Sequence, residues 1–418
     1  MNSDSHSIVF YGAGQNARDN FAKWTNCGIV PVCFVDADNK KWNTRFNPGD
    51  LDILPLEAAI AKYPDYRIYI TPTREKWADI AKDLVHRGIP LTRIKFFEPV
   101  EWRKGCANMG RHFLIHNSIG VCCVPQFSSN LEFEINSDPA KNFKEYENRC
   151  SKIIDDWRSG RPSICDGCPD LEFDIWDIEP KIEALNISSK VNADFCNTKC
   201  IYCCHYPKPE LAAYEKRRRE VIDMLETAHK LYPERRFNVI VSGGDIAVAP
   251  FRDELFAILK KYGWRADIYS NSAVYCEGVS EQLQDGESTY VTTLDSTIRE
   301  KFAEIKGVDC LPKVLENIKR YSEAAADKQQ IKIKLIVLDG VYSSCDEMSG
   351  VVDFAASLGA ELMLSCNVVN VKTRLSQAMF DLMVQWMEYA KSKNVFVKIM
   401  YDHFNIEDAD LLRKQLNI

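Results

Sequence analysis

The sequence predicts an α/β protein in which a doubly wound parallel sheet is followed by a full or partial β/α barrel. Apolar strands alternate with helical patterns over about residues 1–100, the periodicity weakens over 101–180, and the alternation resumes over 181–418. Such alternation favours parallel strands, because each helix returns the chain across one face of the sheet. We therefore expect three parts, with a small cysteine-bearing middle region at 101–180.

The first part begins with an apolar strand that runs into a glycine turn and a helix. Gly12-Ala13-Gly14-Gln15-Asn16-Ala17 matches the pattern G-x-G-x-x-A, and Asp36 ends the next strand. In a dinucleotide-binding unit the glycines let the backbone approach phosphate at the helix N-terminus, and such an acid holds a ribose. The pattern predicts that Gly12, Gly14 and Asp36 contact a small molecule. The elements expected here are a strand and turn at 7–15, a helix at 16–24, strands at 29–35 and 67–70, a helix from about 73 past 85, and a strand at 94–97.

Two further runs add a resemblance to a known kind of domain. Residues 34–39, Phe-Val-Asp-Ala-Asp-Asn, and 53–55, Ile-Leu-Pro, resemble the small N-terminal Rossmann-like domain of nucleotide-sugar acyltransferases and related polysaccharide-pathway proteins. The resemblance implies a nucleotide or nucleotide-sugar as ligand, with NAD as an alternative, or a scaffold without a ligand.

The middle region is marked by its cysteines. Cys165 and Cys168 form a C-x2-C pair, and Cys122 and Cys123 are adjacent. So small a region builds little core alone, so a metal that ties it together is expected. One of Cys122 or Cys123, with Cys165, Cys168 and Cys150, would make a four-thiolate site. It would hold a second [4Fe-4S] cluster or a zinc ion, or the thiols would stay unligated.

The last part repeats strand and helix often enough to form a barrel, which places active residues at the carboxyl ends of its strands. Strands are expected at 182–188, 237–241, 266–270, 288–293, 331–338, 361–366 and 395–399, and helices at 210–231, 253–262 and 311–325.

Cys196, Cys200 and Cys203 follow the first of these strands with the spacing C-x3-C-x2-C. Three thiolates on one short loop can hold three irons of a cubane [4Fe-4S] cluster, and the fourth iron is then open to a small molecule. The alternative is a non-catalytic iron–sulfur or zinc module, in which His205 would complete a zinc site.

This spacing, with the aromatic Tyr202 before the third cysteine, resembles the radical S-adenosylmethionine (radical SAM) enzymes. The resemblance implies that S-adenosylmethionine (SAM) chelates the open iron through its amino and carboxylate groups. It also implies that the reduced cluster cleaves SAM to a 5′-deoxyadenosyl radical, which removes hydrogen from a substrate carbon. A donor such as flavodoxin or ferredoxin would supply the electron.

The next strand ends carry motifs that extend the resemblance over roughly residues 181–400. Gly243-Gly244-Asp245 stands where the family usually has Gly-Gly-Glu, which binds the methionine amino group, so the acid is one methylene shorter here. Asn271 stands where the family commonly has Thr-Asn-Gly, and Asp295 lies in a segment similar to its Ser-Leu-Asp, near ribose and substrate. The resemblance therefore implies that Tyr202, Gly243, Gly244, Asp245, Asn271 and Asp295 surround SAM.

Two cysteines outside the loop are candidates for hydrogen donation to the substrate radical. Cys276 and Cys366 follow or end expected strands, although cysteine is also a common buried apolar residue. The middle cysteines resemble the auxiliary-cluster segments of SPASM-type radical SAM proteins, which usually follow the barrel. Here they precede it, so that assignment does not carry over.

Composition narrows the remaining choices. The net charge is -7, so no basic field favours nucleic acid, and no apolar run approaches the ~18–20 residues needed to span a bilayer. Sixteen cysteines after a polar N-terminus, unlike a signal peptide, indicate a reducing cytoplasm. The expected substrate is a sugar or nucleotide-sugar, with peptide or protein modification as the alternative.

Overall fold

The chain divides into two compact units, Met1–Ala107 with Ile153–Pro180 and Asn108–Lys152 with Lys181–Ile418. The computed structural model describes residues 6–98, 100–115, 118–122, 131–168, 170–178, 181–187, 195–203, 214–367 and 373–416.

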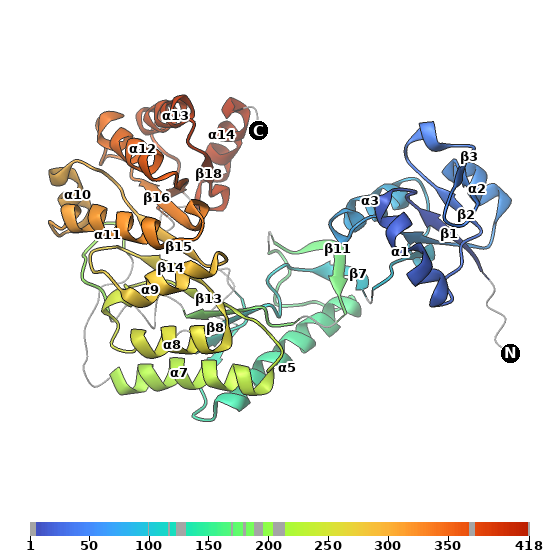
Figure 1. Cartoon of the computed structure of the whole chain (residues 1–418), viewed down its shortest axis with the longest axis horizontal. Coiled ribbons are helices and arrows are strands. Elements are labelled where there is room, and N and C mark those ends of the chain that lie inside the picture. The colour runs from blue at the N-terminus through green and yellow to red at the C-terminus, as the bar shows by residue number, and fades with distance from the viewer. Residues whose placement is uncertain are drawn as a thin grey trace. The chain divides into compact units, whose positions relative to one another are not determined.

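The first unit is built on a six-stranded sheet in the order β3-β4-β2-β1-β5-β6 (Figure 1). All neighbouring pairs are parallel except β3 and β4, which are antiparallel. A separate antiparallel pair, β7 and β11, belongs to the same unit. The elements are β1 Ser7–Tyr11, α1 Gln15–Asn26, β2 Cys33–Val35, β3 Thr44–Phe46, β4 Leu51–Leu54, α2 Leu56–Lys62, β5 Tyr66–Ile70, α3 Trp77–His86, β6 Ile94–Lys95, β7 Val100–Gly105 and β11 Glu172–Asp177.

Alternation along β1 divides this unit's core between the two faces of the sheet. Val9 and Tyr11 join one buried cluster, which also contains Trp77 of α3. Phe10 joins the other, which contains Trp24 of α1. Successive strand residues point to opposite faces, so helices on both faces bury both sets. The doubly wound sheet predicted from the sequence is confirmed.

The second unit contains a ten-stranded sheet in the order β10-β9-β8-β12-β13-β14-β15-β16-β17-β18. Every pair from β8 to β18 is parallel, whereas β9 and β10 join antiparallel. Within the described residues no pairing joins β18 to β10, so this sheet is a partial barrel, as expected. The strands are β8 His112–Ile115, β9 Ser118–Gly120, β10 Glu132–Glu134, β12 Ala184–Ile187, β13 Asn238–Val241, β14 Arg265–Ser270, β15 Thr289–Thr293, β16 Ile331–Val337, β17 Glu361–Cys366 and β18 Val397–Ile399.

Helices follow most of these strands, and neighbouring helices pack against each other, as α7 and α8, α9 and α11, and α12 and α13 do. Figure 1 shows them stacked in chain order along the sheet. This arrangement leaves the carboxyl ends of the parallel strands free to carry a site. The helices are α5 Pro139–Arg158, α7 Tyr214–Leu231, α8 Arg252–Tyr262, α9 Glu277–Gln282, α10 Arg299–Lys306, α11 Leu311–Ala324, α12 Asp346–Leu358, α13 Gln377–Ser392 and α14 Ile406–Leu416.

The stretch 101–180, which we expected to form a middle region, is divided between the two units. β8 pairs with β12 and so extends the barrel sheet, whereas β7 pairs with β11 in the first unit. The backbone groups of these short strands find partners in neighbouring elements, and the stretch needs no core of its own.

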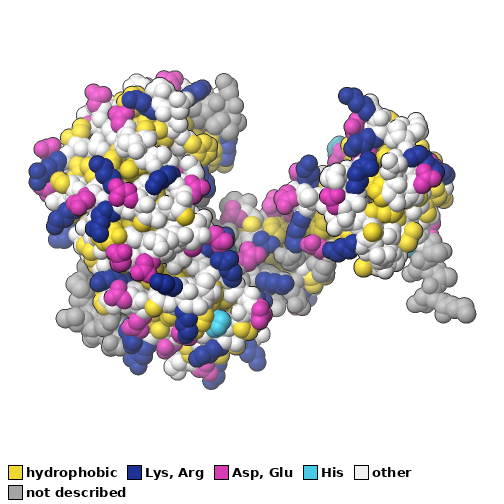
Figure 2. Space-filling model, in the orientation of Figure 1, with side chains coloured by type: hydrophobic (Ala, Val, Ile, Leu, Met, Phe, Trp, Pro, Cys, Tyr) yellow, Lys and Arg dark blue, Asp and Glu magenta, His cyan; other side chains and the backbone are white. Residues whose placement is uncertain are grey.

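Charged side chains of both signs are interspersed on the face drawn in Figure 2. Exposed ion pairs among the described residues include Arg299 with Asp309, at 2.7 Å, and Lys260 with Glu281, at 2.8 Å. Within the described ranges, no helix combines the length and the apolar character that a bilayer crossing requires.

Candidate active site

The cysteine loop lies at the carboxyl side of β12 and is fastened to the end of α10. Its described residues are 195–203. The N–H of Lys199 donates to the carbonyl of Lys306 over 2.9 Å, and the N–H of Ile201 donates to the carbonyl of Ile305 over 3.0 Å. These bonds also satisfy carbonyls that the last turn of a helix leaves free.

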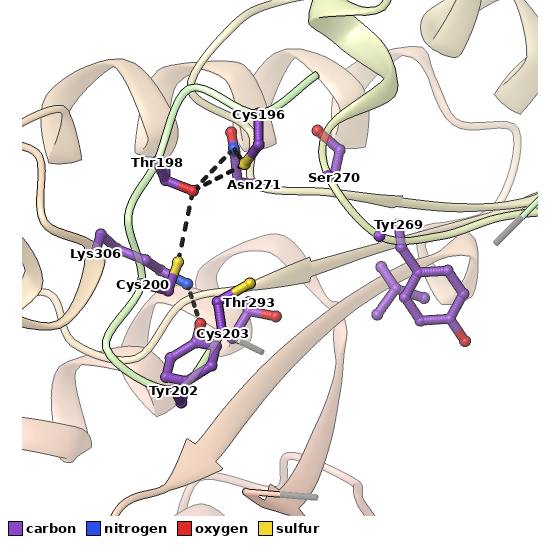
Figure 3. A pocket seen from close by; sticks show the side chains of 13 residues that line it. Cys196, Thr198, Cys200, Tyr202, Cys203, Tyr269, Ser270, Asn271, Thr293 and Lys306 are labelled. Carbon is purple, nitrogen blue, oxygen red and sulfur yellow. Dashed lines mark hydrogen bonds between the residues drawn. The ribbon is translucent and has the colours of Figure 1, made fainter. Parts of the chain in front are cut away.

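A cavity of about 210 Å³ lies against this loop. Cys196, Cys200 and Cys203 all line it, and Figure 3 shows their three sulfur atoms on the concave side of the loop. Gly243 and Asn271 line the same cavity from the carboxyl ends of β13 and β14. The structure therefore brings the predicted cysteine loop together with two of the predicted strand-end motifs.

Thr198 and Asn271 surround the first thiol. The Thr198 hydroxyl lies 3.3 Å from the sulfur of Cys196 and 3.5 Å from that of Cys200. The amide nitrogen of Asn271 lies 3.8 Å from the Cys196 sulfur and donates to the side-chain oxygen of Asn197 over 2.6 Å. Hydroxyl and amide donors of this kind stabilise thiolates, and they are part of how a protein tunes an iron–sulfur site.

The donor set suits a cluster with one open iron. Cys196, Cys200 and Cys203 are the only cysteines among the described residues that line the cavity, and all three are partly exposed. In the part of the chain that is described, no three histidine, cysteine or carboxylate side chains surround a site for a single metal ion, whereas a cubane cluster takes one thiolate on each of three irons. The residue types and the shared cavity fit three-thiolate ligation.

Gly243 and Gly244 form a turn that only glycine adopts readily. Their φ angles are +71° and +56°, in the left-handed region, and both line the cavity directly after β13. Without Cβ atoms, their backbone groups can approach a bound molecule closely.

Asp245 is placed differently from its expected role at SAM. Its carboxylate is fully buried and does not line the cavity. One oxygen accepts from the N–H of Ala247 over 3.1 Å and from the hydroxyl of Ser270 over 2.8 Å, and the other has no hydrogen-bond partner. Burial raises the pKa of Asp245 to about 6. Its side chain fixes the turn from inside the barrel.

Asp245→Asn is expected to stabilise the folded protein near pH 7 and to change it little near pH 4. Because the folded pKa of about 6 lies above 3.8, the ordinary value of an aspartate side chain, the folded state binds the extra proton, and stability falls as pH rises between these values. The loss is roughly 3 kcal/mol, at about 1.4 kcal/mol per pKa unit. Urea unfolding of both proteins from pH 4 to pH 7 measures it; a constant difference across that range would contradict the assignment.

Asp295 and Tyr202 form a buried charged group with Lys306. The Lys306 ammonium lies 2.8 Å from the Asp295 carboxylate and donates to the Tyr202 hydroxyl over 2.6 Å. The Tyr202 hydroxyl donates to Asp295 over 3.0 Å. Burial opposes the charge on Lys306, but the Asp295 carboxylate outweighs it and raises the pKa of Lys306. Tyr202 and Lys306 line the cavity, whereas Asp295, which we expected beside SAM, does not.

Cys276 and Cys366, the candidate hydrogen donors, are both buried and do not line the cavity. Cys276 precedes α9, and its N–H donates to the Tyr321 hydroxyl over 2.8 Å. Cys366 ends β17, and its sulfur lies 3.7 Å from the carbonyl of Val337, the last residue of β16. Burial raises the pKa of both thiols. Neither of these two thiols therefore reaches the cavity at the cysteine loop.

The other predicted metal ligands fall in different places. Cys165 and Cys168 sit in a turn of the first unit, where the N–H of Cys168 donates to the carbonyl of Cys165 over 3.0 Å. Cys122 and Cys150 belong to the second unit, and burial raises the pKa of Cys150 to about 12. Cys123 lies outside the described residues, as does His205.

The first unit has a cavity of about 370 Å³ at the carboxyl ends of β1, β2 and β5. Gly12, Gly14 and Asp36, the residues expected to contact a small molecule, line it together with Lys41. The Asp36 carboxylate accepts from the N–H of Ala13 over 2.7 Å and from Lys41 over 2.9 Å. Burial opposes ionisation of Asp36, but these bonds and one from the N–H of Asp38 lower its pKa. Asp36 therefore ties β2 to the glycine turn in this structure.

Gly12→Ala is expected to destabilise the protein by about 1–3 kcal/mol, the usual cost of a strained backbone position. Gly12 has φ +102°, and an added Cβ would come within 2.8 Å of the Pro72 ring. Gly14→Ala is the matched control, since no atom lies within 4 Å of its added Cβ. Urea unfolding should separate the two variants, and equal stabilities would contradict this reading of the turn.

Sequence reasoning did not assign Thr198, Asn197 or Lys306 to the site. Thr198 and Asn197 lie between the first two cysteines, where only the spacing was used. Lys306 is 103 residues beyond Cys203 along the chain; the sequence resemblance reached Lys306-Gly307 as part of the segment that contains Asp295, but it gave Lys306 no role.

Fold and cavity together define the class of this protein: an α/β partial barrel with a three-cysteine loop at the carboxyl edge of its parallel strands. No protein-family model matches the sequence, and no curated protein matches it. Among solved structures, SuiB of Streptococcus suis bound to SAM gives a TM-score of 0.40 at 15% identity, over 65% of this chain and 54% of SuiB.

Two other solved structures show a similar level of likeness. The first, anSMEcpe with bound AdoMet, has a TM-score of 0.37 and 13% identity over 52% of this chain and 64% of that chain. The second, a radical SAM methyltransferase from Sphaerobacter thermophilus, has a TM-score of 0.35 and 10% identity over 49% of this chain and 63% of that chain. This chain therefore spans less than two thirds of the length of each of these structures. Sequence identities and TM-scores this low do not show the activity or the substrate of this chain.

Proposed function

We propose that this chain is a radical SAM enzyme whose cysteine loop holds a [4Fe-4S] cluster with SAM beside it. The observation that carries the proposal is the shared cavity: Cys196, Cys200 and Cys203 line it together with Gly243-Gly244 and Asn271. When bound, the cluster and SAM supply one-electron cleavage of SAM and a 5′-deoxyadenosyl radical that removes hydrogen from a substrate carbon.

The chain's own residues bind and orient these groups. Cys196, Cys200 and Cys203 provide the thiolates, and the Thr198 hydroxyl, which lies within 3.5 Å of the first two sulfur atoms, can donate to one of them. The backbone carbonyls at Gly243-Gly244 line the cavity and can accept from the ammonium group of SAM, because glycine has no side chain to shield them. The Asn271 amide can donate to a carboxylate or ribose oxygen at the same edge.

Electron paramagnetic resonance tests this assignment. Anaerobically reconstituted protein reduced with dithionite should show the signal of a reduced [4Fe-4S] cluster, and SAM should change that signal because it binds the open iron. Asn271→Ala should keep the signal and require more SAM for the same change. Protein that takes up zinc but no iron would instead support a non-catalytic metal module.

For the substrate we propose a sugar or nucleotide-sugar, supported by the cavity that Gly12, Gly14 and Asp36 line in the first unit. α1 begins beside this cavity with no side-chain cap at Gly14, so its first N–H groups can meet a phosphate. A nucleotide-sugar should therefore raise the melting temperature of the wild type. Gly14→Asp, whose added Cβ meets no atom within 4 Å, should remove that shift by placing a carboxylate there. Stabilisation by a peptide alone would favour peptide modification.

A second [4Fe-4S] cluster is proposed for the middle cysteines. It is supported within the first unit by the C-x2-C turn of Cys165 and Cys168 and by the partial exposure of Cys168. Reconstituted protein should then contain about eight irons per chain, and about four would leave only the cluster at the cysteine loop. Cys168→Ala should lower the iron content by about half while leaving the SAM-dependent signal in place.

A further inference from the structure

Lys306 is the only charged side chain among the described residues that line the cavity at the cysteine loop. Its own side chain is 2% exposed, and that of Asp295, 2.8 Å away, is fully buried. The pair is thus removed from water, where charges interact much more strongly than on a surface. Its two ends differ, because the ammonium borders the cavity and the carboxylate lies behind it.

Two contacts hold the ammonium in this place, and two further bonds fix the groups around it. It bonds to Asp295 and to the Tyr202 hydroxyl, and Figure 3 shows it between Tyr202 and Cys200. The Asp295 carboxylate is itself fixed by the N–H of Ile336 over 3.2 Å. The backbone carbonyl of Lys306 accepts from the N–H of Lys199 over 2.9 Å, which fastens the end of α10 to the cysteine loop.

Gly307 makes this approach of helix and loop feasible. It ends α10 with φ +66°, and a Cβ at this position would lie 2.7 Å from the carbonyl oxygen of Lys199. The chain therefore brings the end of α10, and with it Lys306, directly against the cysteine loop.

We propose that Lys306 is a positioning residue that raises the reduction potential of the cluster held by the cysteine loop. This inference rests on the proposed function. Reduction adds one electron, and so one negative charge, to the cluster. A fixed ammonium at the cavity wall stabilises that added charge, and Asp295, on the far side of the ammonium, offsets the effect only in part. Tyr202 and Asp295 act through Lys306 by holding it.

Opposite shifts in two variants distinguish this role from a merely structural one. Lys306→Met removes the positive charge and should lower the midpoint potential, whereas Asp295→Asn leaves the positive charge uncompensated and should raise it. At a fixed potential near the wild-type midpoint, the ratio of reduced to oxidised cluster should fall about tenfold in Lys306→Met, which equals about 59 mV for one electron. Lys306→Arg keeps the charge and should stay near the wild type.

The measurement is a titration of the cluster signal with dithionite and redox mediators, without substrate. If either single variant fails to fold, the double variant Lys306→Met with Asp295→Asn buries no net charge and should titrate below the wild type. Unchanged potentials, or shifts of the same sign in both single variants, would overturn the inference while the wild-type cluster still responds to SAM. A wild type without any iron–sulfur signal would instead remove the proposed function itself.

Discussion

Replacing Cys196, Cys200 or Cys203 by alanine is expected to abolish 5′-deoxyadenosine formation and to remove the iron of the cluster at the cysteine loop. Each substitution takes one of three thiolates from the cavity wall, and the described lining contains no other cysteine to replace it. Because the three thiols lie on one loop, the loss of any one leaves a two-thiolate site that holds a cubane cluster poorly. Iron content, the absorption of the cluster and 5′-deoxyadenosine after anaerobic reduction are the measurements.

Cys345→Ala provides the matched control for this prediction. Cys345 belongs to the same unit and is partly exposed like the loop thiols, but it precedes α12 and contacts Ser349 at 3.3 Å. Its substitution should leave iron content and product unchanged. If Cys200→Ala retained both as well as this control does, the cysteine loop would not be the cluster site.

Lys306→Met is expected to lower the free energy of unfolding by about 3–5 kcal/mol, the usual cost of leaving one partner of a buried ion pair alone. The Asp295 carboxylate would keep its bonds to Ile336 and Tyr202 but lose the only cation within ion-pair distance among the described residues. A buried charge without compensation is far more costly than a neutral polar group. Urea unfolding of the iron-free protein measures the change independently of any cluster.

The double variant Lys306→Met with Asp295→Asn tests the cause of that loss. An asparagine side chain can accept from the N–H of Ile336 and donate to the Tyr202 hydroxyl, so no charge and few unmet hydrogen bonds remain. Most of the lost stability should therefore return. A double variant as unstable as Lys306→Met would show that packing of the lysine stem, rather than its charge, fixes the loop.

The sequence determined the fold well where periodicity was strong. The buried strand at 7–11 and its glycine turn were predicted from a run of apolar residues and two glycines, and the structure has β1 and α1 there. The strand expected at 29–35 is reduced to β2, Cys33–Val35, because Val30 and Val32 are exposed before it. Apolar residues alone did not reveal where that strand starts.

The short strands β8, β9 and β10 were missed for a physical reason. They have only three or four residues each, too few to show alternation, and their stability comes from pairing with β12 and with one another. Such pairing joins residues about 70 positions apart, such as His112 and Ala184, and a local pattern carries no information about it.

At the site, spacing predicted which residues share a cavity but not how each is used. One cavity is lined by the cysteine loop, Gly243-Gly244 and Asn271, as expected for residues that follow neighbouring parallel strands. Asp245 and Asp295 stand in the expected motifs, yet their carboxylates face the protein interior. The direction of a side chain at a strand end depends on the turn that follows, and the Asp245 carboxylate lies inward, where it accepts from the N–H of Ala247 and the hydroxyl of Ser270.

The most direct test of the account is whether the protein cleaves SAM at this cluster. Wild-type protein, reconstituted and reduced without oxygen, should convert SAM to 5′-deoxyadenosine and methionine in equal amounts, and the three-cysteine variant should form neither. A wild type that binds a [4Fe-4S] cluster but yields no 5′-deoxyadenosine above the variant's level would contradict the assignment as a radical SAM enzyme.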